Sequence, residues 1–213
     1  MIWIIDTNII VHWLMAKQVM SCCVEQFRLS SEFSTIYENR LKHSIAFISR
    51  ALEIPKERHD FLVVELSLNE IFSGVRDEVR SILLFSKGVP LSRLTSMRSA
   101  KEARFSEELA KIVYEATSRG LDTLFGTAGM DIIHTTSPSD EKTYLEVYSS
   151  LVFLHPSLAT QDAILVATAI FQKADYFVTE DNTLIGLGKD KRFGARYTIK
   201  IVAPQQASQL LGE

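Results

Sequence analysis

Cysteine is nearly absent from this sequence, and neither sign of charge dominates it. Its two cysteines, Cys22 and Cys23, are adjacent. Neighbouring cysteines rarely pair with each other, and two thiols without a histidine nearby do not make a zinc site. Scarce cysteine also favours a reducing compartment. The formal net charge of -3 does not by itself indicate a nucleic-acid-binding protein, so any attraction to phosphate must come from local basic patches.

The opening residues, MIWIIDTN, carry neither the basic segment nor the cleavage site of a secretory signal. Asp6 interrupts their apolar run after Ile5, which makes the run too short to cross a membrane. We therefore expect a cytoplasmic protein without a membrane partner.

Short apolar runs alternate with helical patterns along the 213 residues, of which 46% are hydrophobic. Strands are expected at 2–5, 61–64, 132–133, 152–154, 175–179 and 197–202. Helices are expected at 8–29, 30–52, 67–87, 91–119, 141–151, 157–173 and 204–211, with loops at 120–129 and 186–196. This alternation predicts a three-layer α/β/α fold with a central, mainly parallel sheet. We expect one domain over residues 1–213, with an inserted helical region at about 76–150.

Four acidic residues lie just after predicted strands or in the first turns of predicted helices. Asp6 ends the first strand, and Asp181 follows the strand ADYFV. Glu70 lies in the first turn of the helix after the second strand, and Asp162 lies in the first turns of the helix at 157–173. Ligands of open α/β sheets bind at the carboxyl ends of the strands, so these side chains can converge if the strands are parallel.

Four carboxylates in one place repel one another, and a divalent cation offsets that repulsion. Hard oxygen ligands with few histidines favour Mg²⁺ or Mn²⁺ over zinc. Such an ion can polarise a phosphoryl oxygen and generate a hydroxide near neutral pH.

Each acid also has a structural interpretation. Asp6 could cap the following helix, and Ser67 with Glu70 fits the S-x-x-E capping box. Asp162 could complement a helix dipole, and Asp181 could cap a helix or stabilise a turn. Taken together, four acids at strand-to-helix junctions favour the metal site.

Three stretches resemble the motifs of PIN-domain nucleases. IIDTNIIV, residues 4–11, resembles their opening strand, and ELSLNEIFSG, residues 65–74, resembles their second acidic motif. The third stretch resembles their last two motifs, in which a D-A pair opens a small-residue helix and T-x-D closes the next strand. It reads QDAILVATAIFQKADYFVTEDNTL, residues 161–184.

The resemblance implies a compact α/β/α fold with a parallel sheet, a pocket for Mg²⁺ or Mn²⁺, and endoribonuclease activity. It assigns the catalytic and metal-binding roles to Asp6, Glu70, Asp162 and Asp181. It gives supporting roles to Thr7 and Asn8, which would shape the loop around Asp6, and to Thr179, which would position the last strand end.

Glu180 and Glu65 are the nearest alternative acids if one of these four assignments is wrong. Glu70 is preferred to Glu65 because Glu70 is followed by Gly74, as in the family's E-x-x-x-G pattern. The chain departs from the small PIN toxins of toxin–antitoxin pairs in its greater length, with extra residues before Phe61 and between Gly74 and His155. That length weakens the toxin assignment more than the nuclease assignment.

Two basic stretches could contact phosphates. The first contains Arg93, Arg98, Lys101 and Arg104, and we favour a solvated helix face for it. The second follows the Asp181 motif, and we expect it to bind RNA beside the metal pocket; a solvated face with ion pairs, for example to Asp190, is the alternative. The second stretch contains Lys189, Lys191, Arg192, Arg196 and Lys200. None of the five histidines shows the spacing of a metal site, so all are interpreted as structural or surface residues.

The leading hypothesis is a metal-dependent endoribonuclease, either a toxin with an antitoxin partner or an RNA-processing enzyme, and homodimerisation stays open. The alternative is a catalytically silent PIN-like module that binds RNA or protein. A phosphatase of the haloacid-dehalogenase type is disfavoured because it needs D-x-D where this sequence has Asp6-Thr7-Asn8.

Overall fold

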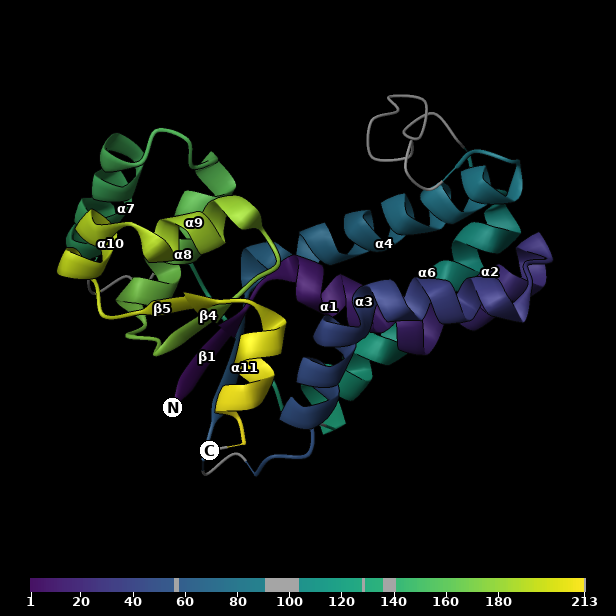
Figure 1. The fold of residues 1–213 in the computed structure, drawn as a ribbon, viewed down its shortest axis with the longest axis horizontal. Helices are drawn as coiled ribbons and strands as arrows, with labels where there is room; N and C mark the ends of the chain where they lie inside the picture. Colours follow the sequence, from purple (N-terminus) through teal and green to yellow (C-terminus); the bar gives the residue numbers. More distant parts are fainter. Residues whose placement is uncertain (56–57, 91–103, 128, 136–140, 213) are drawn as a thin grey trace.

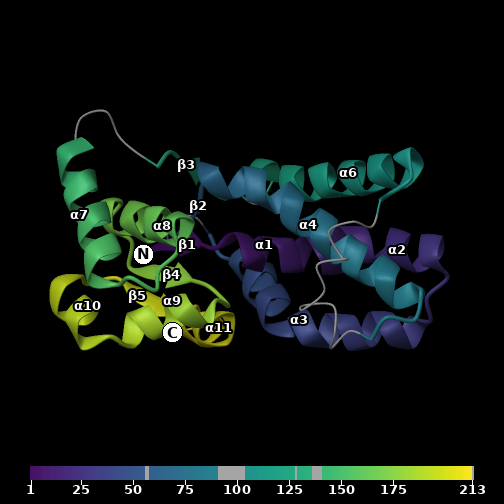
Figure 2. The same ribbon diagram turned by 90° about the horizontal axis from the view of Figure 1, so that it is seen from above.

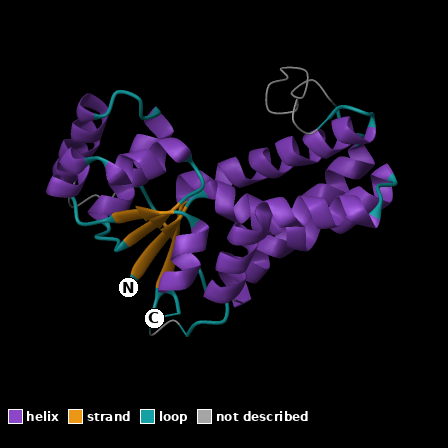
Figure 3. Ribbon diagram, viewed as in Figure 1, coloured by secondary structure: helices purple, strands orange, loops and turns teal. Residues whose placement is uncertain are grey.

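The computed structural model describes residues 1–55, 58–90, 104–127, 129–135 and 141–212. A five-stranded sheet lies at its centre, with the strands fanning out between two groups of helices (Figure 3). The strands run parallel to one another in the order β3-β2-β1-β4-β5. Their bounds are β1 Ile2–Ile5, β2 Asp60–Val64, β3 Asp131–Ile133, β4 Tyr176–Val178 and β5 Lys200–Val202. This confirms the expected α/β fold with a parallel sheet.

Alternating side chains of the strands bury two separate cores. In the central strand β1, Trp3 and Ile5 point to one face and Ile4 points to the other. The neighbouring β4 repeats the alternation, because Val178 belongs to the first core and Phe177 to the second. The two-residue period of a strand therefore requires helices on both faces of the sheet.

A bundle of helices covers the first face and extends far beyond the sheet (Figure 1). It starts with α1, Thr7–Leu14, which passes through a π-helical turn, Met15–Val19, into α2, Met20–Phe27. The bundle continues with α3, Ser31–Ala51, then α4, Glu65–Ser86, and α6, Glu107–Leu121, which leads into a second π-helical turn, Asp122–Thr127. Helix α1 packs against both α3 and α4, so the first residues after Asp6 lie between these two helices.

A second group of helices covers the other face (Figure 2). It comprises α7, Glu141–Leu154, α8, Thr160–Phe171, α9, Asn182–Lys189, and α10, Lys191–Arg196. The last helix, α11 Pro204–Leu210, instead packs on α3. Helices α8 and α9 each begin near the carboxyl ends of the strands, because α8 leads back to the start of β4 and α9 follows its end.

Several expected elements differ from the structure. The predicted strand at 152–154 is the last turn of α7, and the predicted loops at 120–129 and 186–196 are largely helical. Of the helix expected at 91–119, residues 91–103 lie outside the described residues. The helical bundle also takes in residues 7–51, so it is wider than the insertion expected at about 76–150, whose first residue lies inside α4.

Within the described ranges, no helix has both the length and the apolar character needed to cross a bilayer.

Candidate active site

The predicted acids lie at the carboxyl edge of the sheet. Asp6 directly follows β1, Glu70 lies in the second turn of α4 after β2, Asp162 lies in the first turn of α8, and Asp181 follows β4. Charge interactions link Asp162 with each of the other three and link Asp6 with Glu70. The four acids, named here the carboxylate cluster, are therefore linked by charge through Asp162 at one edge of the sheet, the edge at which the parallel topology predicts that they lie.

Asp6 is the most buried member of the carboxylate cluster. Its side chain is 6% exposed, and its backbone N–H donates to the carbonyl oxygen of Val178 in β4 at 3.0 Å. The pKa of Asp6 is raised to about 6, chiefly by burial. Hydrogen bonds from Thr179 and the Thr7 backbone lower the pKa, and the charges of Asp162 and Glu70 act with burial to raise it. Asp6 occupies the N-cap position of α1, but its side chain makes no capping bond to that helix. The capping interpretation is therefore wrong for Asp6.

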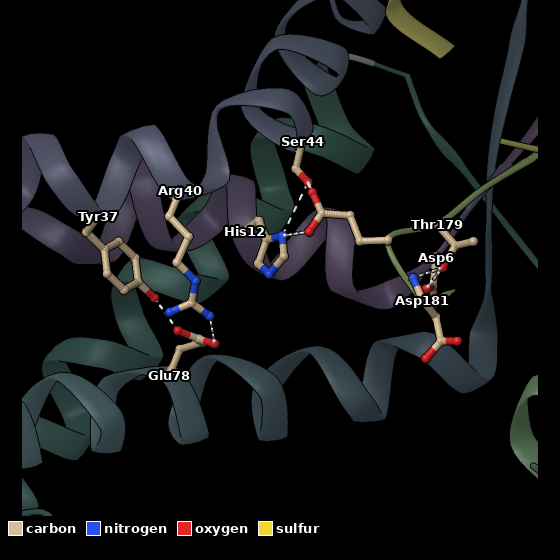
Figure 4. A network of polar contacts seen from close by, with 9 residues as sticks. Asp6, His12, Tyr37, Arg40, Ser44, Glu78, Thr179 and Asp181 are labelled. Carbon is tan, nitrogen blue, oxygen red and sulfur yellow. Dashed lines mark hydrogen bonds and ion pairs between the residues drawn. The ribbon is translucent and has the colours of Figure 1, made fainter. Parts of the chain in front are cut away.

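Thr179 connects Asp6 to Asp181 (Figure 4). Its side chain is fully buried, and its hydroxyl donates to Asp6 Oδ2 at 2.6 Å. The same hydroxyl accepts the backbone N–H of Asp181 at 2.9 Å. Its own backbone N–H donates to Val202 in β5 at 3.1 Å, so the residue is fixed by the sheet. One hydroxyl thus sets the positions of two acids.

Glu70 is held by the first residue of α1, since the Thr7 hydroxyl donates to Glu70 Oε2 at 3.0 Å. The loop expected from Thr7 and Asn8 is helical, because α1 begins directly after Asp6. The capping box expected from Ser67 and Glu70 is wrong, because α4 already begins at Glu65 and its N-cap is Val64. Ser67 lies inside the helix, where its buried hydroxyl has no hydrogen-bond partner. Asn8, the other supporting residue expected near Asp6, is exposed.

Asp162 and Asp181 form the other side of the carboxylate cluster. The pKa of Asp162 is raised by burial first and then by the charges of Asp181 and Glu70. Asp181 caps α9, since its Oδ1 accepts the backbone N–H groups of Thr183 at 2.6 Å and Leu184 at 3.1 Å. Capping therefore holds the Asp181 carboxylate beside Asp162 and does not compete with a role in the site.

The two substitute acids are engaged elsewhere. The Ser44 hydroxyl donates to Glu180 Oε1 at 2.5 Å, and His12 Nδ1 lies 3.3 Å from Glu180 Oε2. Burial raises the pKa of Glu180, but these bonds outweigh it, so the pKa is lowered. Glu65 pairs with His134 at 2.6 Å on the surface. Sequence reasoning missed the contacts of His12 and Ser44, because neither residue lies near Glu180 in the chain.

Further along the same helices, the Tyr37 hydroxyl donates to Glu78, and Arg40 lies 3.7 Å from that carboxylate (Figure 4). These contacts tie α3 to α4 across α1. Ser44 and His12 separately hold α3 and α1 against the segment that carries Thr179 and Asp181, through their contacts with Glu180.

The chemistry of the carboxylate cluster fits a hard divalent cation. The charges that act on Asp6 and Asp162 are those of other carboxylates, so the region is a centre of negative charge. Across the described residues, no three or more His, Cys, Asp or Glu side chains are already arranged as a metal site. The four acids supply oxygen ligands for such a cation, and a bound cation would offset the repulsion between their charges.

The second basic stretch is helical and does not form a loop beside the acids. Arg192 Nη2 pairs with Asp190 at 3.3 Å. The Arg196 guanidinium lies over the ring of Tyr197. Arg196 also lines a pocket together with Ala174 and Ile199, which lie just before β4 and β5. That places Arg196 at the end of the sheet opposite the carboxylate cluster. RNA binding by Lys189, Lys191 and Arg192 stays a prediction, and the Arg192–Asp190 pair is the ion pair of the alternative, a solvated face. Of the first basic stretch only Arg104 lies within the described residues.

No family model, curated protein or solved structure matches this chain.

Proposed function

We propose that this protein is a metal-dependent endoribonuclease with a PIN-like fold, acting in the cytoplasm. The observation that supports the proposal is a set of charge interactions in which Asp162 is linked to the buried Asp6, to Glu70 and to Asp181, at the carboxyl edge of a parallel sheet. The preference for RNA as substrate comes from the three motifs that resemble PIN-domain nucleases. A toxin with an antitoxin partner and an RNA-processing enzyme both fit this chemistry.

The protein's own contribution is to hold charge in a fixed place. A bound Mg²⁺ or Mn²⁺ would supply the positive charge that polarises a phosphoryl oxygen and lowers the pKa of water. Thr179 holds Asp6, Thr7 holds Glu70, and the start of α9 holds Asp181. These contacts fix three carboxylates before substrate binds, which reduces the reorganisation needed during the reaction.

The purified protein should cleave a mixture of unstructured RNAs when Mg²⁺ or Mn²⁺ is present, because the cation offsets the repulsion within the carboxylate cluster. Cleavage should stop when a chelator is added and resume when excess metal is restored. Gel analysis of end-labelled RNA measures both steps. RNA that is bound but stays intact at every metal concentration would favour the catalytically silent binding module instead.

A further inference from the structure

A cavity of about 270 Å³ lies between the segment that links α7 to α8 and helix α9. The residues that matter most in its lining are His155, Ser157, Leu158, Asn182, Thr183 and Asp190. Nothing in the proposed hydrolysis of a phosphodiester uses this space.

The cavity adjoins the carboxylate cluster. Asn182 and Thr183 directly follow Asp181, whose Oδ1 accepts the Thr183 backbone N–H at 2.6 Å. On the opposite wall, Ser157 and Leu158 lead into α8, which carries Asp162 in its first turn. A phosphate held by a cation at Asp162 and Asp181 would therefore have its neighbouring nucleoside within reach of the cavity.

The charge of the lining selects against an anion. Asp190 contributes a carboxylate, which lies 3.5 Å from His155 Nδ1 and 3.3 Å from Arg192. Arg192 and His155 keep that carboxylate ionised, because their contacts lower the pKa of Asp190. Among the described residues that line the cavity there is no Lys or Arg, and the Asp190 carboxylate already pairs with Arg192, so the lining offers no free positive charge to an anion and the occupant should be neutral.

The polar groups of the lining suit the edge of a heterocycle. Asn182 offers an amide donor and an acceptor side by side, Ser157 and Thr183 offer hydroxyls, and Leu158 offers an apolar surface. Proteins that recognise single-stranded RNA form hydrogen bonds of this kind along the edge of an unstacked base. The volume lies just below the range of roughly 300–1,000 Å³ typical of small-molecule sites, which suits one base better than a whole nucleotide.

We propose that this cavity binds one unpaired nucleobase of the RNA, next to the phosphate that is cut, and that Asn182 reads the edge of that base. This inference rests on the proposed nuclease function. It implies that cleavage depends on the identity of one nucleotide beside the scissile bond.

Binding is tested first without phosphate or metal, using adenosine, cytidine, guanosine and uridine as probes. Two-dimensional NMR of the wild-type protein should show at least one nucleoside shifting the backbone amides of Asn182 and Thr183. Leu158→Trp, which fills the cavity, should remove those shifts. The matched change Leu145→Trp on the exposed surface of α7 should preserve them. Shifts that are absent from the wild type, or unchanged in Leu158→Trp, would overturn the base site.

Cleavage specificity is tested with four short RNAs that differ only at the nucleotide beside the cut. Asn182→Ala should reduce the ratio between the best and worst RNA by about tenfold, the usual worth of a well-placed amide contact to a base. Asn182 is exposed, so this variant should fold, and Asn39→Ala on the exposed face of α3 is its control. An unchanged ratio in Asn182→Ala would overturn the assignment of Asn182.

The two hypotheses fail in different ways. Cleavage by the wild type with a base preference that Leu158→Trp and Asn182→Ala leave intact would reject the base site and leave the nuclease standing. Nucleoside binding in the cavity without any metal-dependent cleavage would support the base site and reject the nuclease.

Discussion

Replacing Asp6 with asparagine should remove metal-dependent RNA cleavage and, at the same time, make the metal-free protein more stable at pH 8. Asp6 is the most buried carboxylate of the cluster and interacts with the charges of Asp162 and Glu70. Removing its charge removes a ligand for the cation, so the cleavage rate should fall by roughly 10²–10³, the loss typical of one preorganised catalytic group.

The stability effect follows from the pKa of Asp6. Its folded pKa is about 6, above the ordinary value of 3.8, so folding disfavours the ionised form. The stability contributed by protonated Asp6 is fully present below pH 3.8 and is lost as the pH rises through about 6. A shift of this size corresponds to at most about 3 kcal/mol. The substituted asparagine carries no charge at any pH, so the variant should gain roughly 1–3 kcal/mol at pH 8 and little at pH 4.

Urea unfolding in chelator at the two pH values measures this gain, and single-turnover cleavage with Mn²⁺ measures the loss of activity. Asp60→Asn is the matched control, because Asp60 is an exposed aspartate at the start of β2, at the other end of the sheet. The account fails if Asp6→Asn cleaves RNA like the wild type, or if its free energy of unfolding at pH 8 does not rise above that of Asp60→Asn.

Thr179→Val should damage both stability and activity although it changes neither a charge nor the side-chain volume appreciably. The variant leaves the backbone N–H of Asp181 without its acceptor and Asp6 without its side-chain donor. Leaving a buried polar group without a partner costs about 1–3 kcal/mol. Because the hydroxyl orients two acids of the carboxylate cluster, cleavage should also fall by roughly 10–100-fold, as when an outer-shell partner of a metal site is lost.

Thr117→Val is the matched control for Thr179→Val. Thr117 is also buried, but its hydroxyl donates to the carbonyl oxygen of Val113 within α6, away from the acids. Thermal melts with and without Mn²⁺ should show a smaller metal-dependent rise in the melting temperature for Thr179→Val than for Thr117→Val. Equal metal responses would show that Thr179 contributes to packing alone.

Local sequence patterns predicted the features that depend on residues adjacent in the chain. The apolar, β-prone run before Asp6 and the run before Thr179 indicated buried strands that end beside polar residues, and both strands are present. Parallel topology then predicted that acids at the carboxyl edge of the sheet would interact, and Asp162, at the start of α8, interacts with the charges of the other three acids. The sequence alone therefore predicts which acids lie at the carboxyl edge of the sheet.

Other features depend on partners distant in the chain. The glycines at 186–194 indicated a loop, yet Gly188 lies in α9, where a Cβ would come within 2.9 Å of Ile201. That glycine permits close packing of a helix on β5. Likewise, the S-x-x-E pattern at Ser67 indicated a helix start, but β2 passes directly into α4 at Glu65. The role of His12 depends on Ser44 in α3 and on Glu180 after β4, which no local pattern joins.

The central claim is that Asp6, Glu70, Asp162 and Asp181 together hold a divalent cation. Anomalous diffraction from crystals grown with Mn²⁺ tests it most directly, because the signal locates manganese without reference to activity. The account predicts a manganese peak among these four carboxylates, with a second peak about 3.5–4 Å away if two ions bind. Well-diffracting crystals with no manganese peak at the carboxylate cluster, or with manganese bound only elsewhere, would contradict it.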